Sequence, residues 1–135
     1  MNILCFRNSR LGDLLVVIPA LKLIKKKNPK AKIFYVTDYN KNSSSLPKCF
    51  EKDKIIDEYI FYNYNFIGIF KLAKNIRKTN FDCIYNLHDA ENFFRRVRNY
   101  LFFYFCGLKK KYGFFYKKEN YRKYNETFQL AKRVN

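Results

Sequence analysis

The segment that opens the chain constrains the fold more than any other. Residues 2–6 form an apolar run with the length of one buried strand. A polar stretch with one glycine follows, and residues 14–27 then have the length of a helix and apolar first turns. A strand that passes through a short loop into a helix is the first half of a βαβ unit. In open parallel sheets that loop lies at the carboxyl edge, where ligands bind.

The remainder of the chain continues the alternation of strands and helices. Further strands are predicted at residues 32–37, 55–62, 81–87 and 110–115, and helices at 46–51, 67–78, 92–105 and 126–133. This pattern predicts an α/β fold with a doubly wound, Rossmann-like parallel sheet of about five strands. Residues 1–135 show no internal repeat, linker or low-complexity segment. We therefore expect one domain of the usual size, roughly 100–150 residues.

The apolar patterns also predict which faces are buried. The first helix is expected to be largely buried, with a kink or a late start at Pro19. The continuous apolar run of the fourth strand favours a strand that is covered on both faces. Further apolar sets are predicted in the third strand (Ile56, Tyr59 and Phe61), in the helix at 67–78 (Ile69, Leu72, Ala73 and Ile76) and on one face of the helix at 92–105 (Phe94, Val97, Leu101 and Phe105).

Asp13 is the first candidate for a functional residue because it is expected at the mouth of this carboxyl edge, at or near the first turn of the helix. Aspartate is a favoured N-cap, and its carboxylate suits the positive end of a helix dipole, so a capping role is one interpretation. A carboxylate at the edge of a parallel sheet, beside Arg7 and residues 8–10, can also serve as a general base. The loop matches neither glycine-rich phosphate-binding pattern, which argues against a nucleotide site.

Two later segments bring polar side chains toward the same edge. His88, the sole histidine, directly follows the fourth strand and is either a hydrogen-bonding loop residue or part of a ligand site. Arg95, Arg96 and Arg98 occupy the first half of the next helix, and guanidinium groups suit phosphates and carboxylates. The same side chains can lie over apolar surface as solvated cations, so both interpretations stay open. Residues 25–27, three lysines, suit the end of the first helix better than a ligand.

Cysteine usage and hydropathy limit the class of protein. The four cysteines are widely spaced and form no CxxC pair, which favours structural thiols over a zinc site or disulfides. With one histidine and no cluster of ligands, no metal site is predicted, and no cofactor is expected. The sequence has no run of roughly 18 apolar residues, as a membrane span requires. The first residues do not have the pattern of a cleaved signal peptide. We therefore expect a cytoplasmic protein.

The net charge of +17 is concentrated at the two ends of the chain. Residues 1–37 carry eight basic and one acidic residue, residues 109–135 carry nine and two, and residues 38–90 are nearly balanced. A basic field attracts nucleic acid, anionic lipid or a phosphorylated glycolipid, although a coding bias toward lysine produces the same excess. The basic ends and the aromatic residues at 100–105 predict peripheral contact with the inner face of the membrane.

The order of several short motifs resembles glycosyltransferase family 9, which contains the ADP-heptose:lipopolysaccharide heptosyltransferases. The motifs are Leu11-Gly12-Asp13-Leu14-Leu15, Ile18-Pro19-Ala20-Leu21, Ile84-Tyr85-Asn86-Leu87-His88 and Lys111-Tyr112-Gly113-Phe114. The resemblance extends over residues 2–115. It implies the amino-terminal, acceptor-binding domain of a two-domain GT-B glycosyltransferase, in which the carboxyl-terminal domain holds the nucleotide-sugar donor.

The resemblance also implies roles for particular residues. Asp13 matches the aspartate that is taken as the base for the acceptor hydroxyl in this family, whose inverting transfer requires no metal. The acceptor, a phosphorylated or lipid-linked sugar, is then expected to contact Asn8, Ser9, Arg10, Gly12, His88, Arg95, Arg96 and Arg98. The 135 residues have no counterpart of the donor-binding domain. We therefore expect a truncated glycosyltransferase or a chain that needs a partner for transfer.

Two functional hypotheses follow. The first is a heptosyltransferase-like domain that binds the sugar acceptor in the synthesis of lipopolysaccharide core or another surface glycan. The alternative is a non-enzymatic, basic α/β module that binds anionic membrane or nucleic acid. Because the sequence has no aromatic RNA-binding signature, nucleic acid is the less favoured partner.

Overall fold

The computed structural model describes residues 1–7, 11–38, 55–88 and 92–115, and only the helical backbone of residues 11–14. The described elements are, in chain order, β1 (Asn2–Phe6), α1 (Leu11–Lys27), β2 (Lys32–Asp38), β3 (Glu58–Tyr62), α3 (Phe66–Thr79), β4 (Cys83–Asn86), α4 (Phe93–Phe105) and β5 (Lys110–Tyr112). The helices predicted at 46–51 and 126–133 lie outside the described residues.

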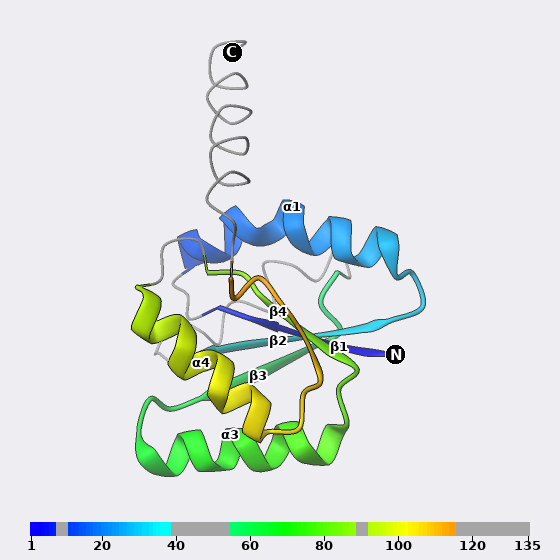
Figure 1. The fold of residues 1–135 in the computed structure, drawn as a ribbon. Coiled ribbons are helices and arrows are strands. Elements are labelled where there is room, and N and C mark those ends of the chain that lie inside the picture. The colour runs from blue at the N-terminus through cyan, green and yellow to red at the C-terminus, as the bar shows by residue number, and fades with distance from the viewer. Residues whose placement is uncertain (8–10, 39–54, 89–91, 116–135) are drawn as a thin grey trace.

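The five strands form one parallel sheet in the order β3-β2-β1-β4-β5 (Figure 1). The chain winds outward from β1 to β3, then crosses back over the sheet and winds outward through β4 and β5. Helix α1 covers one face of the sheet, and α3 and α4 cover the other (Figure 1). The predicted doubly wound α/β fold is therefore confirmed, and β1 and β4 flank the point where the winding reverses.

Successive residues of the central strands pack into two different cores. Leu4, Val36 and Ile84 belong to the cluster beneath α3 and α4, whereas Cys5 and Cys83 belong to the cluster beneath α1. Side chains alternate between the two faces of a strand, so a strand covered on both faces needs an unbroken apolar run. The prediction for the fourth strand is confirmed.

Helix α1 is buried along one side only. Val17, Leu21 and Ile24 face the sheet, but Leu15 is 55% and Val16 64% exposed. The expectation of a largely buried helix is wrong, because nothing in the described part of the chain covers the outer side of α1. The helix begins at Leu11, so a late start at Pro19 is also wrong, whereas a kink stays a prediction.

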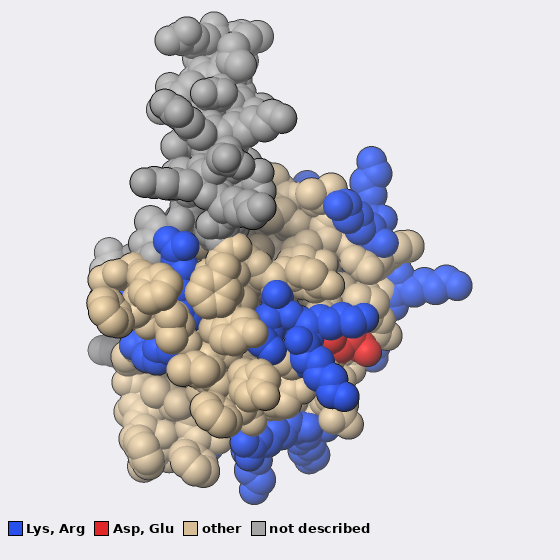
Figure 2. All heavy atoms as spheres, in the orientation of Figure 1, with Lys and Arg blue, Asp and Glu red and all other residues tan. Residues whose placement is uncertain are grey.

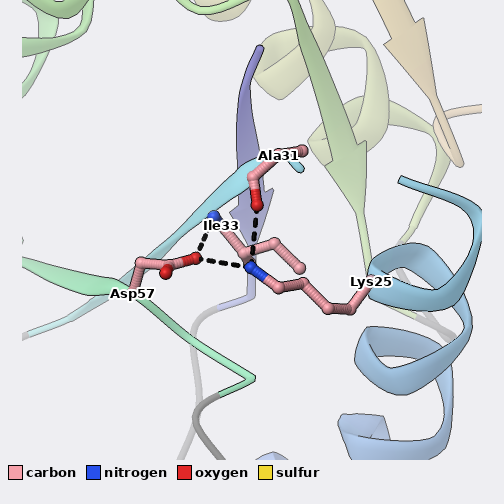
Figure 3. A network of polar contacts seen from close by, with 4 residues as sticks. All are labelled: Lys25, Ala31, Ile33 and Asp57. Atoms are coloured by element: carbon pink, nitrogen blue, oxygen red, sulfur yellow. Dashed lines mark hydrogen bonds and ion pairs between the residues drawn. The ribbon is translucent and has the colours of Figure 1, made fainter. Parts of the chain in front are cut away.

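Strand β3 begins at Glu58, later than expected. Asp57, the residue before it, forms a polar network. Its Oδ2 accepts hydrogen bonds from the backbone N–H of Ile33 (2.7 Å) and from Nζ of Lys25 (3.1 Å), as Figure 3 shows. Lys25 Nζ also donates to the carbonyl oxygen of Ala31 (2.8 Å). This network ties the end of α1 to the amino edge of the sheet. It gives Lys25 a structural role, in line with the prediction.

The core predicted for the third strand is only partly correct. Ile55 and Tyr62 are buried, whereas Ile56, Tyr59 and Phe61 are half-buried. Strand β3 lies at the edge of the sheet, so it has a neighbour on one side only. An edge strand therefore buries less of its surface than its apolar pattern suggests.

Helix α3 follows its sequence pattern. The side chain of Asn65 caps its first turn by accepting a hydrogen bond from the backbone N–H of Gly68 (2.7 Å). Leu72 and Ile76 are buried, and Ile69 and Ala73 are half-buried. The helical spacing selects the buried residues of α3 correctly, although Phe66, Ile67 and Phe70 of the same helix are exposed.

The apolar face predicted for α4 is wrong. Phe94 is 79% and Phe105 68% exposed, whereas Asn99 and Phe103 are buried. The ring of Phe103 packs edge-on against Phe6, with 5.0 Å between centroids. Aromatic residues lie around most of the circumference of α4, so their spacing does not predict which face is buried. The contacts of Phe103 with the sheet determine the buried face.

No helix in the described part of the chain is long and apolar enough to cross a membrane.

Candidate functional site

The reversal point of the winding lies between β1 and β4, and the chain leaves these two neighbours toward opposite faces of the sheet. The loop after β1 leads into α1, and the loop after β4 leads into α4 on the other face. In doubly wound sheets this separation leaves a crevice at the carboxyl edge, which is where ligands bind. The carboxyl ends of β1 and β4 are therefore the candidate site.

Arg7 joins the ends of the two strands. It is buried, and its guanidinium Nη1 donates a hydrogen bond to the carbonyl oxygen of Leu87 (2.8 Å). The backbone N–H of Leu87 in turn donates to the carbonyl oxygen of Phe6 (3.0 Å). Strand pairing thus continues beyond β1 and β4. A buried cation holds the edge of the crevice in place.

His88 lies beside this pair. Its ring packs at a tilt against Phe6, with 5.2 Å between centroids, and its backbone N–H donates to Oδ1 of Asn86 (3.3 Å). Asn86 is buried, and the backbone of Gly113 passes so close to it that a Cβ at this position would clash with the Asn86 carbonyl oxygen. Gly113 also has a φ of +79°, a conformation that glycine adopts at no steric cost. These contacts position the half-buried imidazole at the carboxyl edge.

Asp13 is the third residue of α1, so it belongs to the first helical turn. The N-cap position is residue 10, which lies outside the described residues. A carboxylate in the first turn is stabilised by the helix dipole, and the backbone N–H groups of this turn also favour an anionic ligand. Gly12 lies in the same turn. The topology places this turn and His88 at the same edge, after neighbouring strands.

The arginines of α4 differ in their surroundings. Arg95 and Arg98 are exposed and Arg96 is half-buried. Nη2 of Arg98 donates to Oδ1 of the neighbouring Asn99 (3.2 Å). Arg98 also lines a cavity of about 190 Å³ between α3 and α4, and Phe6 lines the same cavity.

Phe6 therefore connects His88 with the cavity that contains Arg98. The other lining residues include Tyr62, Leu72, Phe102 and Phe103, so the cavity is mainly apolar. It suits an apolar group beside an anion better than a sugar, because sugar hydroxyls that are buried need polar partners. A larger cavity of about 530 Å³ lies at the opposite, amino edge and includes Asn80 and Gly107.

Asn8, Ser9 and Arg10 lie outside the described residues. Sequence reasoning placed Arg7 only beside Asp13. The hydrogen bond from Arg7 to Leu87 could not be predicted from the sequence, because 80 residues separate these two residues. The apolar cavity could not be predicted from the sequence either, because it depends on the orientation of α4 that buries Phe103 against the sheet. In the described part of the chain, no three His, Cys, Asp or Glu side chains lie together as metal ligands would.

The three described cysteines lie in the core, not at the carboxyl edge. Burial raises the pKa of Cys106 to about 11. Burial also raises the pKa of Cys5, with a smaller contribution from Cys83, and it raises the pKa of Cys83 itself. These thiols are protonated at neutral pH and are poor nucleophiles. They are free, as predicted for structural thiols.

Two solved structures share this fold. One is the glycosyl transferase family 9 protein from Veillonella parvula DSM 2008 (TM-score 0.60, 22% identity), and the other is ADP-heptose lps heptosyltransferase II from E. coli (TM-score 0.60, 19% identity). Each match covers 82% of this chain and 30% of the other chain. The chain thus has the fold of one domain of these larger proteins and spans less than a third of their length. No protein-family model and no curated protein sequence matches it.

Proposed function

We propose that this chain is the acceptor-binding domain of an inverting glycosyltransferase that acts in the synthesis of lipopolysaccharide core or a similar surface glycan in the cytoplasm. The observation that carries the proposal is the position of Asp13 in the first turn of α1, directly after β1 at the reversal point of the sheet. The fold shared with one domain of two heptosyltransferase-type structures supports it.

In this proposal Asp13 is the general base. Its carboxylate takes the proton from an acceptor hydroxyl as that oxygen attacks the anomeric carbon of the donor sugar. The bond from this carbon to the oxygen of the β-phosphate breaks at the same time, so the configuration inverts and the nucleoside diphosphate leaves. A base of this kind must lie within hydrogen-bond reach of the hydroxyl and typically contributes about 10²–10⁴ in rate.

The remaining edge residues have roles in binding. Gly12 and the backbone N–H groups of the first turn of α1 suit an anionic group of the acceptor. His88, which Phe6 and Asn86 position, is a hydrogen-bonding group for the sugar. Asn8, Ser9, Arg10, Arg95 and Arg96 are further candidates for contacts with acceptor phosphates, and Arg98 is a weaker one because it lines the apolar cavity.

The donor must come from a second domain. The test therefore mixes the full chain with the donor-binding half of a heptosyltransferase, ADP-heptose and a phosphorylated lipopolysaccharide core oligosaccharide. We expect transfer in the mixture, a loss of roughly 10²–10⁴ in rate for Asp13→Asn, and unchanged binding of the oligosaccharide by this variant in calorimetry. Glu58→Gln, at the amino edge, is the matched control and keeps full activity. If the chain does not bind the oligosaccharide, the proposal is wrong.

A further inference from the structure

The outer surface of α3 and α4 exposes aromatic side chains to water. Phe66 is 81% and Phe70 70% exposed at the start of α3, and Phe93, Phe94, Tyr104 and Phe105 are exposed along α4. We call these six residues the aromatic surface. Their rings lie in neighbouring pairs, with centroids 5.9 Å apart for Phe66 and Phe70 and 6.1 Å apart for Phe93 and Phe94. Exposed apolar patches of this kind mark interaction sites.

The same two helices carry only positive charge. Their sequences contain seven basic residues and no acidic one: Lys71, Lys74, Arg77 and Lys78 in α3, and Arg95, Arg96 and Arg98 in α4. Figure 2 shows a broad uncharged area on this side of the molecule, with many lysine and arginine side chains and few acidic atoms beside it. The partner of the aromatic surface must therefore combine an apolar interior with negative charge at its boundary.

We propose that the aromatic surface docks onto an anionic lipid bilayer. Aromatic rings favour the boundary between headgroups and acyl chains, and lysine and arginine reach back from there to lipid phosphates. A second copy of the chain would bring seven cations against seven more. Nucleic acid would pair with the cations, but Ile67 and Leu101, exposed aliphatic residues of the same two helices, gain nothing from phosphates. An anionic bilayer can bind both the cations and the apolar side chains.

Docking in this way also orients the candidate site. Helices of a parallel α/β sheet begin at its carboxyl edge, so the first turns of α3 and α4 lie at the same edge as the start of α1. Phe66, Phe70, Phe93 and Phe94 would then hold this edge against the lipid, where a lipid-linked acceptor is found. This orientation rests on the proposed function, whereas docking itself does not.

The first test compares exposed apolar residues on the two faces of the sheet. The full chain is sedimented at low salt with vesicles of phosphatidylcholine and phosphatidylglycerol in equal parts, without any sugar. We expect the wild type to bind. The Phe94→Ser/Phe105→Ser variant is expected to bind roughly tenfold or more weakly, because it loses two exposed rings that docking buries in the bilayer. Leu15→Ser/Val16→Ser, on the exposed side of α1, is the matched control and binds like the wild type. Thermal melting by circular dichroism confirms that each variant is folded.

The second test concerns charge. Lys71→Gln/Lys74→Gln is expected to weaken binding to anionic vesicles severalfold, whereas Lys26→Gln/Lys27→Gln in the last turn of α1 has little effect. Binding to vesicles of phosphatidylcholine alone is expected to be weak, and high salt releases the chain from anionic vesicles. The proposal is overturned if the wild type ignores anionic vesicles at low salt, if the α1 control weakens binding as much as the phenylalanine pair, or if a single-stranded oligonucleotide binds tightly while vesicles do not.

Discussion

The two faces of the sheet are covered by different kinds of layer. Helix α1 packs aliphatic residues against the sheet and exposes a few aliphatic residues outside, while Asp13 lies in its first turn. Helix α4 packs the ring of Phe103 inward and α3 packs Leu72 and Ile76 inward, and both helices expose aromatic rings outward. The comparison shows that the position of an apolar residue in a helix sequence does not always predict whether its side chain is buried in the core or exposed on the surface.

The layers also divide the proposed functions. The α1 layer contributes the carboxylate for chemistry, and the α3–α4 layer contributes the cations and rings for docking. If the exposed rings serve docking and not the core, substitutions of buried residues should destabilise the domain, whereas substitutions of the exposed rings should leave it folded. The sharpest contrast lies within α4 itself.

The largest expected effect is that of Phe103→Ala. Phe103 is fully buried and packs against the rings of Phe6 and Phe114, so its truncation should lower the free energy of unfolding by about 3–5 kcal/mol. Phe105→Ala, two residues away and exposed, should change it by less than about 0.5 kcal/mol. Urea denaturation followed by circular dichroism measures both. Equal losses would show that the outer face of α4 belongs to the core.

A smaller effect concerns the thiol of Cys106, which lies in the core beneath α3 and α4. Burial raises the pKa of this thiol to about 11 in the folded protein, whereas the thiol of the unfolded chain ionises near its ordinary pKa of 9.0. The folded state thus binds more protons in this range, so stability falls as the pH rises from 9 to 11, by roughly 2 kcal/mol from this group. Denaturation midpoints of the wild type and Cys106→Ala across this range measure it. The variant should decline less steeply, and identical slopes would contradict the assignment.

The smallest effect concerns the network that ties α1 to the amino edge. Lys25→Ala should cost at most about 1 kcal/mol, because both partners of its ion pair with Asp57 are partly exposed to solvent. Asp57→Ala should cost more, about 1–2 kcal/mol, because it also leaves the backbone N–H of Ile33 without its acceptor. A double-mutant cycle in low and high salt separates the two contributions. A larger cost for Lys25→Ala than for Asp57→Ala would contradict this explanation.

The candidate site was accessible to sequence reasoning only in part. Asp13 and His88 were identified because each follows a strand, and such positions meet at the carboxyl edge of any parallel sheet. The pairing of Arg7 with Leu87 and the support of Asn86 by Gly113 could not be foreseen. Both join segments that are distant in the sequence. Their geometry exists only after the strands are paired.

Local patterns in the chain determined the element types, the parallel sheet and the burial of its central strands. An unbroken apolar run with the length of a strand is stable only in a sheet whose two faces are both covered. The orientation of α4 and the exposure of α1 were settled by tertiary packing alone. A helix that is apolar around most of its circumference can bury either side at similar cost, so the shape of the sheet beneath it selects the side that is buried. The side that is left outside becomes the surface on which the docking proposal rests.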